Sequence, residues 1–336
     1  MAGRIRRIIL ILASLVLCAG SALAGEAAPV QVYRELRRAV PEDARESFLY
    51  FTDPHMAEAP GWEPAFERNM REIAAMADEL QLGLVLCGGD WIGSLDTNAE
   101  AVEKLSQLTD FNLSLFGAGR YHGAVGNHDT NEQGSKDMEV RQRRTETLTI
   151  GEYTNAMMPL TGLAYEAFDG ENTRFYLVDS GYEGQKMNYR GEGRYRWRML
   201  EWLAEDLRAK DPQHAAILTH IYYRTSRSRS PGELGTYLVR LCDAFNRHSV
   251  FKADGHVFDF RACTGRVEFM LCGHIHIDFC SYPASFPVIT TQTASSLNED
   301  GSLSLTYDLA LVDYRERILT LLRVGSGDSR TIPLDP

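Results

Sequence analysis

Five short clusters of metal-ligating residue types recur along this sequence, each directly after a hydrophobic, β-prone run. They are Asp53-Pro54-His55, Gly88-Gly89-Asp90, Gly126-Asn127-His128-Asp129, Thr219-His220 and Gly273-His274-Ile275-His276. Their carboxylate, amide and imidazole donors suit divalent first-row metal ions. No thiolate joins the set, which argues against a structural zinc finger. The residue types therefore indicate a centre that binds metal ions through oxygen and nitrogen.

The spacing within each cluster suits shared coordination. Asp53 and His55 can reach one ion from a single turn, and alternate residues of a strand end, such as His274 and His276, point to one side. Neighbouring glycines let the backbone turn tightly and let an ion or a phosphate approach closely. A carboxylate can bridge two ions with its two oxygens, and Asp90 is the natural candidate. Two ions roughly 3.5–4 Å apart can hold a bridging water, lower its pKa and clamp a phosphate for in-line attack.

Each cluster taken alone has a simpler explanation. A lone Asp-x-His is usually a solvated turn, Gly-Gly-Asp is typical of a hairpin turn, and two histidines can form a surface pair. The occurrence of all five clusters in this order leaves coincidence little weight. Four histidines fall outside the clusters and are expected to be structural or solvated: His122, His214, His248 and His256. His122 is near the third cluster in sequence, so a substrate role for it stays open.

Hydrophobic periodicity predicts the elements that carry these clusters. Strands are expected over residues 48–51, 84–87, 121–125, 163–168, 173–178, 215–218, 267–271, 288–291, 303–312 and 318–324. Helices are expected over residues 62–80, 98–108, 198–209 and 233–245, and a polar loop over the site at residues 130–144. Ligands gather at strand ends in α/β sheets, so the strands should position the donors. Alternating strands and helices, followed by a strand-rich tail, predict two packed sheets with helices outside.

Length and composition allow one large domain with a substantial core. The chain has 336 residues, of which 44% are hydrophobic and 24% charged. Its net charge is -11 and its pI about 5.4, which makes it a poor electrostatic match for nucleic acid. A small phosphorylated substrate would therefore be attracted by local positive charge, such as metal ions, rather than by the overall field.

The N-terminal segment has the features of a secretory signal peptide. Three arginines within the first seven residues precede an apolar run over residues 8–17, and Ala22-Leu23-Ala24 forms a small-x-small cleavage site. Cleavage after Ala24 predicts an exported protein, periplasmic or extracellular. An uncleaved membrane anchor is the alternative, although the apolar core is short for a span. The expected organisation is a signal peptide (1–24), a lead-in segment (25–46) and a single domain (47–336).

The cysteine pattern favours buried thiols over a disulfide framework. Five cysteines follow the leader, an odd number at irregular spacing. Cys87 and Cys272 fall inside predicted core strands, where small buried hydrophobic groups are expected. A single bridge, for example between Cys263 and Cys280, stays open.

The five clusters, in this order, resemble those of the calcineurin-like metallophosphoesterase superfamily, in the form carried by bacterial exported members. The resemblance runs from Phe51 to His276 and more loosely to the C-terminus. It implies a four-layer α/β/β/α sandwich of two mixed β-sheets flanked by helices. It also implies a dinuclear metal-dependent phosphoesterase, in which a metal-bridging hydroxide attacks a phosphate monoester or diester.

The resemblance further implies a role for each cluster residue. The first ion takes Asp53, His55 and His276, the second takes Asn127, His220 and His274, and Asp90 bridges both. His128 matches the family's general acid, which protonates the leaving oxygen, and Asp129 matches the orienting partner of that acid. The ions would be Mn, Fe or Zn, since all three accept these ligands.

Two more segments are similar to bacterial members of this family: the paired strands from Tyr165 to Ser180 and the Leu-x-Trp-Leu helix at Leu200. The sequence departs from the family at Pro54, where a small polar residue is more usual. It departs again at residues 221–223, where many members have a proline shortly afterwards.

The sequence leaves the substrate and the oligomeric state open. Monoester, diester and nucleotide pyrophosphate hydrolysis share these ligands, because the surrounding loops choose the substrate. Arg224, Arg227 and Arg229 are either a solvated loop or a phosphate clamp, and residues 325–330 could fold back over the site. An exported binding module without catalysis is one alternative, but the ligand set is complete. A nuclease is another, but the chain is acidic and lacks a long basic stripe.

Overall fold

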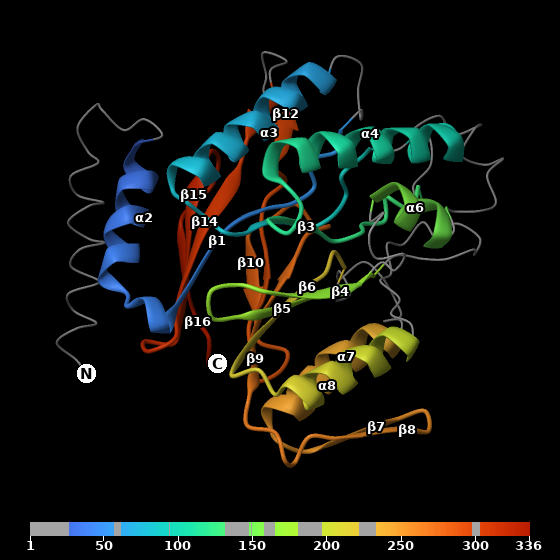
Figure 1. Cartoon of the computed structure of the whole chain (residues 1–336), viewed down its shortest axis with the longest axis vertical. Helices are drawn as coiled ribbons and strands as arrows, with labels where there is room; N and C mark the ends of the chain where they lie inside the picture. The colour runs from blue at the N-terminus through green and yellow to red at the C-terminus, as the bar shows by residue number, and fades with distance from the viewer. Residues whose placement is uncertain are drawn as a thin grey trace.

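The computed structural model describes residues 27–56, 62–93, 95–131, 148, 150–157, 165–180, 197–221, 233–297 and 303–336. Two six-stranded sheets form its centre, and helices cover the outer face of each sheet (Figure 1). These sheets are called the first and the second sheet below. They matter for function because their strands end at the five sequence clusters.

The first sheet runs in the order β16-β15-β14-β1-β2-β3 and carries the three N-terminal clusters. Its strands are β1 (Arg45–Phe51), β2 (Val85–Cys87), β3 (Tyr121–Gly123), β14 (Tyr307–Asp313), β15 (Ile318–Val324) and β16 (Arg330–Pro333). β1, β2 and β3 are parallel to one another, whereas β14 pairs with β1 in the antiparallel sense. The residues that follow β1, β2 and β3 therefore meet at one edge of the sheet.

The second sheet runs in the order β10-β11-β9-β6-β5-β4 and carries the two C-terminal clusters. Its strands are β4 (Glu166–Asp169), β5 (Arg174–Leu177), β6 (His214–Leu218), β9 (Arg266–Cys272), β10 (Phe279–Ser281) and β11 (Val288–Thr290). β5, β6 and β9 are parallel, while β4 and β10 are antiparallel edge strands. Both sheets are thus mixed, and in both the clusters follow parallel strands.

Three hydrophobic cores separate the layers. The helices over the first sheet are α2 (Ala27–Ala39), α3 (Trp62–Glu79) and α4 (Asn98–Phe116), and those over the second are α7 (Trp197–Lys210) and α8 (Glu233–Asn246). Side chains of β1 alternate between layers: Leu49 and Phe51 pack under the helices, and Phe48 and Tyr50 pack against the second sheet. Every residue of β1 after Arg45 is buried, because both faces of the strand are covered. The predicted four-layer sandwich is confirmed.

The structure adds elements that periodicity did not indicate. They are α2, β10, β16, α6 (Ile150–Met157), which packs on α4, the 3₁₀ turn η1 (Glu42–Ala44), the hairpin of β7 (Val250–Ala253) and β8 (His256–Asp259), and β12 (Ser295–Leu297), which pairs with β13 (Leu303–Leu305). The strand expected over 303–312 is divided at Thr306 into β13 and β14. Short strands and single-turn helices bury too few side chains to show a clear period.

Helix α2 and the start of β1 precede the expected domain boundary at residue 47, and both pack with the domain. In α2, Val30 and Tyr33 are buried against the first sheet, and the hydroxyl of Tyr33 donates to the carbonyl of Ala310 at 3.3 Å. Only one face of this helix is apolar, so its apolar residues are few among polar and charged ones. The composition of the segment therefore did not indicate a helix that packs on the sheet.

Five cysteines in the described residues have free thiols, so no bridge joins Cys263 to Cys280. Cys87 and Cys272 are buried, as expected for small core residues. Among the residues that the structure describes, no helix combines the length and the apolar character that a membrane span needs.

Candidate metal centre

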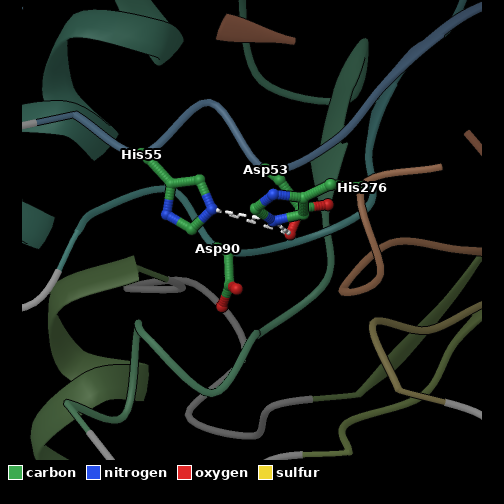
Figure 2. Close-up of side chains that lie close together, drawn as sticks. All are labelled: Asp53, His55, Asp90 and His276. Carbon is green, nitrogen blue, oxygen red and sulfur yellow. Dashed lines mark hydrogen bonds and ion pairs between the residues drawn. The ribbon is translucent and has the colours of Figure 1, made fainter. Parts of the chain in front are cut away.

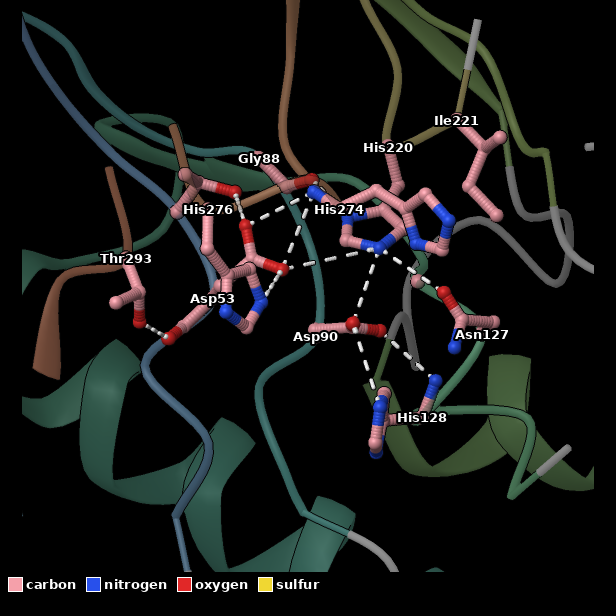
Figure 3. Close-up of polar contacts among 12 residues, drawn as sticks. Asp53, Gly88, Asp90, Asn127, His128, His220, Ile221, His274, His276 and Thr293 are labelled. Carbon is pink, nitrogen blue, oxygen red and sulfur yellow. Dashed lines mark hydrogen bonds and ion pairs between the residues drawn. The ribbon is translucent and has the colours of Figure 1, made fainter. Parts of the chain in front are cut away.

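The ligand clusters of both sheets converge on one place (Figure 3). Asp53, Asp90 and Asn127 follow β1, β2 and β3 of the first sheet, and His220 and His274 follow β6 and β9 of the second. Parallel strands of the two sheets end at the same edge of the sandwich, so donors far apart in sequence become neighbours. Six of the seven predicted metal ligands fall within two groups of donors, described next, and the seventh, Asn127, lies beside His220.

The first group joins Asp53, His55, Asp90 and His276 (Figure 2). Nε2 of His55 lies 3.1 Å from Nε2 of His276, and the latter lies 3.0 Å from Oδ1 of Asp53. Two nitrogens that share one ion at about 2.1 Å each lie roughly 3.0–3.4 Å apart in octahedral or tetrahedral geometry. The spacing of these donor atoms therefore fits one metal ion.

The second group joins Asp90, His220 and His274. Nε2 of His220 lies 3.0 Å from Oδ2 of Asp90 and 3.2 Å from Oδ1 of Asn127. Oδ1 of Asp90 accepts the backbone N–H of His128 at 2.8 Å, so Oδ2 is the oxygen that faces His220. Asp90 is common to both groups, which is the position that a bridging carboxylate requires.

The backbone of the centre is held in an unusual conformation. Five of the predicted ligands have positive φ: Asp53 (53°), His55 (48°), Asp90 (55°), His274 (74°) and His276 (55°). Non-glycine residues rarely adopt this left-handed region, and such residues cluster at functional sites that their surroundings hold in place. Here the conformation turns each side chain off its strand and toward the centre.

Two glycines let these turns approach one another. A Cβ on Gly126 would lie 2.0 Å from Oδ1 of Asp90, and a Cβ on Gly273 would lie 2.5 Å from Oδ2 of Asp53. Both distances are far below van der Waals contact. Glycine is therefore required at these positions by the space that the ligands occupy.

Further contacts orient the ligands. Nδ1 of His220 lies 2.8 Å from the carbonyl of Gly88, which leaves Nε2 for the centre. The hydroxyl of Thr52 donates to Oδ2 of Asp53 at 2.5 Å, and the hydroxyl of Thr293 donates to the carbonyl of Asp53 at 2.6 Å. Sequence reasoning missed Thr293, which is 240 residues from Asp53 and lies in no recognisable motif.

Asp129 has a different task from the orienting role that the resemblance implies. Its Oδ1 accepts the backbone N–H groups of Trp91 and Ile92 at 2.7 and 3.2 Å, and its Oδ2 accepts those of Asp90 and Gly126 at 2.9 and 2.8 Å. The carboxylate is fully buried and faces the backbone rather than the His128 ring. Burial raises its pKa to about 8, yet four N–H donors on its two oxygens suit the ionised form. Asp129 thus ties the turn after β2 to the turn after β3.

His128 lies beside the centre with part of its side chain exposed. Its Nε2 is 4.0 Å from Oδ2 of Asp90, and its side chain is 21% exposed, whereas that of His220 is fully buried. The ring packs edge-to-face against His55, with centroids 4.8 Å apart. A group in this position can contact both the ligands and a molecule that arrives from solvent.

The charges of the centre favour a cation. Burial raises the pKa values of Asp53 and Asp90, but His220 and the other nearby histidines together outweigh it and hold both below the usual range. Burial lowers the pKa of His220, but these carboxylates outweigh it and raise that pKa to about 10. Burial lowers the pKa values of His128 and His274 to about 4. The carboxylates thus stay ionised and attract positive charge at neutral pH.

Several residues singled out in the sequence lie elsewhere. Nδ1 of His122 pairs with Glu166 at 2.7 Å, and its ring stacks on Phe168, so it serves packing. His214 pairs with Glu268 and His256 with Glu201. Residues 325–329 form the turn between β15 and β16, and Arg330 begins β16. Of the loop expected over residues 130–144, residues 132–144 lie outside the described residues, and so do the three arginines at 224, 227 and 229.

Comparison with known proteins agrees with this geometry. The family model for the calcineurin-like phosphoesterase matches residues 47–278. A dimetal phosphatase from Danio rerio shares the fold with a TM-score of 0.54 at 14% identity, over 87% of this chain and 100% of that one.

Weaker likenesses are seen to an anchor in the inner membrane complex of Plasmodium (TM-score 0.45, 12% identity, 87% of this chain and 89% of that one) and to an NAD nucleotidase of Haemophilus influenzae (TM-score 0.36, 13% identity, 86% and 50%). No curated protein matches the sequence. The donor geometry and the extent of the family match lead to one assignment: the chain belongs to the calcineurin-like phosphoesterase family.

Proposed function

We propose that this protein is a dinuclear metal-dependent phosphoesterase that hydrolyses small phosphate monoesters or diesters. The observation that carries the proposal is the convergence of two donor groups that share Asp90. Oxygen and nitrogen donors from two sheets meet there without a thiolate, whereas structural zinc sites are usually rich in cysteine. The family match supports a hydrolase of phosphoric esters.

The ligands divide between two ions in this proposal. Asp53, His55 and His276 would hold the first ion, Asn127, His220 and His274 the second, and Asp90 both. When bound, the two ions polarise the phosphoryl group and activate water. Mn, Fe and Zn all suit these donors.

His128 is the proposed general acid, which gives a proton to the leaving oxygen. Its backbone N–H donates to Oδ1 of Asp90, and its partly exposed ring lies 4.0 Å from Oδ2 of the same carboxylate. A bound phosphate places negative charge beside the imidazole, which opposes the effect of burial on its pKa. The buried Nδ2 of Asn127 has no hydrogen-bond partner among the described residues, so it can donate to a phosphate oxygen at the same place.

The experiment compares a chromogenic phosphodiester, bis(p-nitrophenyl) phosphate, with the matching monoester. Purified protein is stripped of metal with a chelator and refilled with Mn, Zn or Fe, and bound metal is counted by elemental analysis. We expect two ions per chain and metal-dependent turnover, and the ratio of the two rates distinguishes a phosphodiesterase from a phosphatase. Asp90→Asn should abolish turnover, whereas Asp110→Asn, on the exposed surface of α4, should not change it.

Three outcomes would change the proposal. Two bound ions without turnover of either ester would point to a more specific substrate. A protein that binds no metal would be a binding module with this fold. Tight binding of duplex DNA that weakens steeply with salt would favour a nuclease.

Export is a separate part of the proposal. Residues 1–26 lie outside the described residues, and the sequence pattern of the first 24 residues carries the expectation. The mass of the protein recovered from a secreting host should show a chain that begins at Gly25. A full-length chain in the membrane fraction would favour the uncleaved anchor.

A further inference from the structure

The proposed metal centre is divided between the two sheets. Asp53 and Asp90 come from the first sheet, whereas His220, His274 and His276 come from the second. The distance between donors therefore depends on how the sheets are held together at this edge. A shift of about 0.5 Å is enough to disturb a site of this kind.

One buried arginine connects the sheets beside the centre. Arg323, on β15 of the first sheet, is 3% exposed and lies between two carboxylates. Its Nε lies 2.7 Å from Oδ1 of Asp308, on the neighbouring strand β14. On its other side, Nη2 lies 2.6 Å and Nη1 3.2 Å from the two oxygens of Asp278.

Asp278 connects this arginine to the metal centre, because it is two residues after His276. It lies between that ligand and β10, the edge strand of the second sheet. A contact at Asp278 therefore constrains the chain on the far side of His276, while β9 constrains it before His274. The turn that carries both histidines is held at each end.

Neighbouring groups complete the contacts of the arginine. Nη2 donates to the hydroxyl of Thr291 at 2.6 Å, and Nη1 donates to the carbonyl of Ser326 at 2.9 Å. The Thr291 hydroxyl in turn lies 2.6 Å from Asp308 and 3.2 Å from Asp278. Gly327, with φ of +98°, lets the turn after β15 close over the guanidinium, since a Cβ there would lie 2.7 Å from Nη1. The guanidinium is thus fixed in one orientation.

Stability alone does not account for this arrangement. A buried ion pair is often replaceable by apolar residues without loss of stability, because desolvation offsets the attraction. A guanidinium paired with two carboxylates does fix geometry, since its fork of N–H groups has one favourable orientation toward each. The guanidinium lies where the two sheets meet, next to the turn that carries His274 and His276. Its fixed orientation can therefore hold that turn in place.

We propose that Arg323 and Asp278 are positioning residues for the metal centre, which set the His274–His276 turn of the second sheet against Asp53 and Asp90 of the first. This inference rests on the proposed function for the existence of the centre. It predicts that Asp278 controls the affinity of the ion that His276 helps to bind.

The test replaces Asp278. Arg323 then keeps its pair with Asp308, and Arg330, which loses a contact of 3.3 Å with Asp278, keeps Asp308 at 3.8 Å. The matched control is Asp206→Ala on α7, which loses a bidentate pair with Arg174 at 2.8 and 3.2 Å. Asp206 is 18% exposed and Asp278 19%, so the two changes are alike in burial. Metal-stripped proteins are titrated with Zn²⁺ and with Mn²⁺ against a competing chelator, and urea unfolding is followed in parallel.

We expect Asp278→Ala to weaken the binding of one of the two ions by about 10-fold, the lower end of the loss that follows when a group that orients a metal ligand directly is removed. The other ion should bind with an unchanged Kd, and Asp278→Asn should fall between Asp278→Ala and the parent. Asp206→Ala should bind both ions like the parent while losing a similar amount of stability.

Parent affinity for both ions in Asp278→Ala would overturn the inference, as would an equal loss in Asp206→Ala. A parent protein that binds two ions but hydrolyses no ester would refute the proposed activity only. The metal affinities of Asp278→Ala and Asp206→Ala would still decide this inference. A parent that binds no ion would overturn both.

Discussion

Replacing Asp129 by asparagine should destabilise the protein strongly, even though the change removes one oxygen and adds one nitrogen. Each carboxylate oxygen of Asp129 accepts two backbone N–H groups. An asparagine has one oxygen, so its amide nitrogen must face the other two donors in either orientation of the side chain. Two buried N–H groups then lose their acceptor.

The size of the loss follows from this count. A buried donor left without a partner costs about 1–3 kcal/mol, so two of them predict a loss of about 2–6 kcal/mol. Two of the four N–H groups belong to Asp90 and Gly126, in the turns that form the centre. Metal affinity should therefore fall together with stability.

The assay is urea unfolding of the metal-stripped proteins, followed by far-ultraviolet circular dichroism. Asp129→Asn is compared with the parent and with Asp110→Asn, which makes the same chemical change on the exposed surface of α4. The control should stay within about 0.5 kcal/mol of the parent. A loss in Asp129→Asn no larger than that of the control would refute the assignment of Asp129 as the tie between the two turns.

Three other changes test the centre and the fold. His128→Gln should lower kcat by about 10²–10⁴-fold for an alkyl phosphate ester but much less for a p-nitrophenyl ester, whose leaving group hardly needs a proton; an equal loss on both would count against the general acid. Gly126→Ala should lose metal binding, since its Cβ would lie 2.0 Å from a ligand oxygen, while Gly83→Ala, with nothing within 4 Å of the new Cβ, should bind metal normally in the same titration. The third change is Asp211→Asn. Burial raises the pKa of Asp211, but the backbone N–H groups that donate to its carboxylate outweigh burial and lower that pKa. Its stabilising effect should therefore be present above about pH 4, the unfolded value, and disappear as the pH falls through the lower folded value. The urea midpoints of Asp211→Asn and the parent should accordingly converge in acid, and a gap that widens there would contradict the sign.

Hydrophobic periodicity predicted helices and strands correctly where the residues of one segment determine its secondary structure. The expected helix over 62–80 is α3, and the expected strand over 267–271 lies within β9. In both, the apolar residues repeat with the period of the element, so neighbours along the chain determine the structure. The predicted boundaries of the elements were less accurate than their types. Helix α4 continues to Phe116, eight residues past its expected end, because its last turns pack on the first sheet.

Contacts between segments that are distant in sequence were not predicted by any local pattern. Asp129 was expected beside His128, its neighbour in sequence, yet its partners are backbone groups of residues 90–92 and 126. Backbone N–H groups carry no sequence signal, because every residue except proline has one. Thr293 and Arg323 act on the centre in the same way, from segments that contain no ligand.

The amino-acid sequence by itself determined which donors this protein offers and the order of the strands that present them. That information lies in residue types and in short periodic runs. Only the tertiary structure decided that the first and second sheets face each other so that Asp90 is shared by two donor groups, and that Arg323 and Asp129 hold those groups in place. The physical reason is that ligand identity is a property of single residues, whereas donor distances of about 3 Å depend on the packing of two whole sheets.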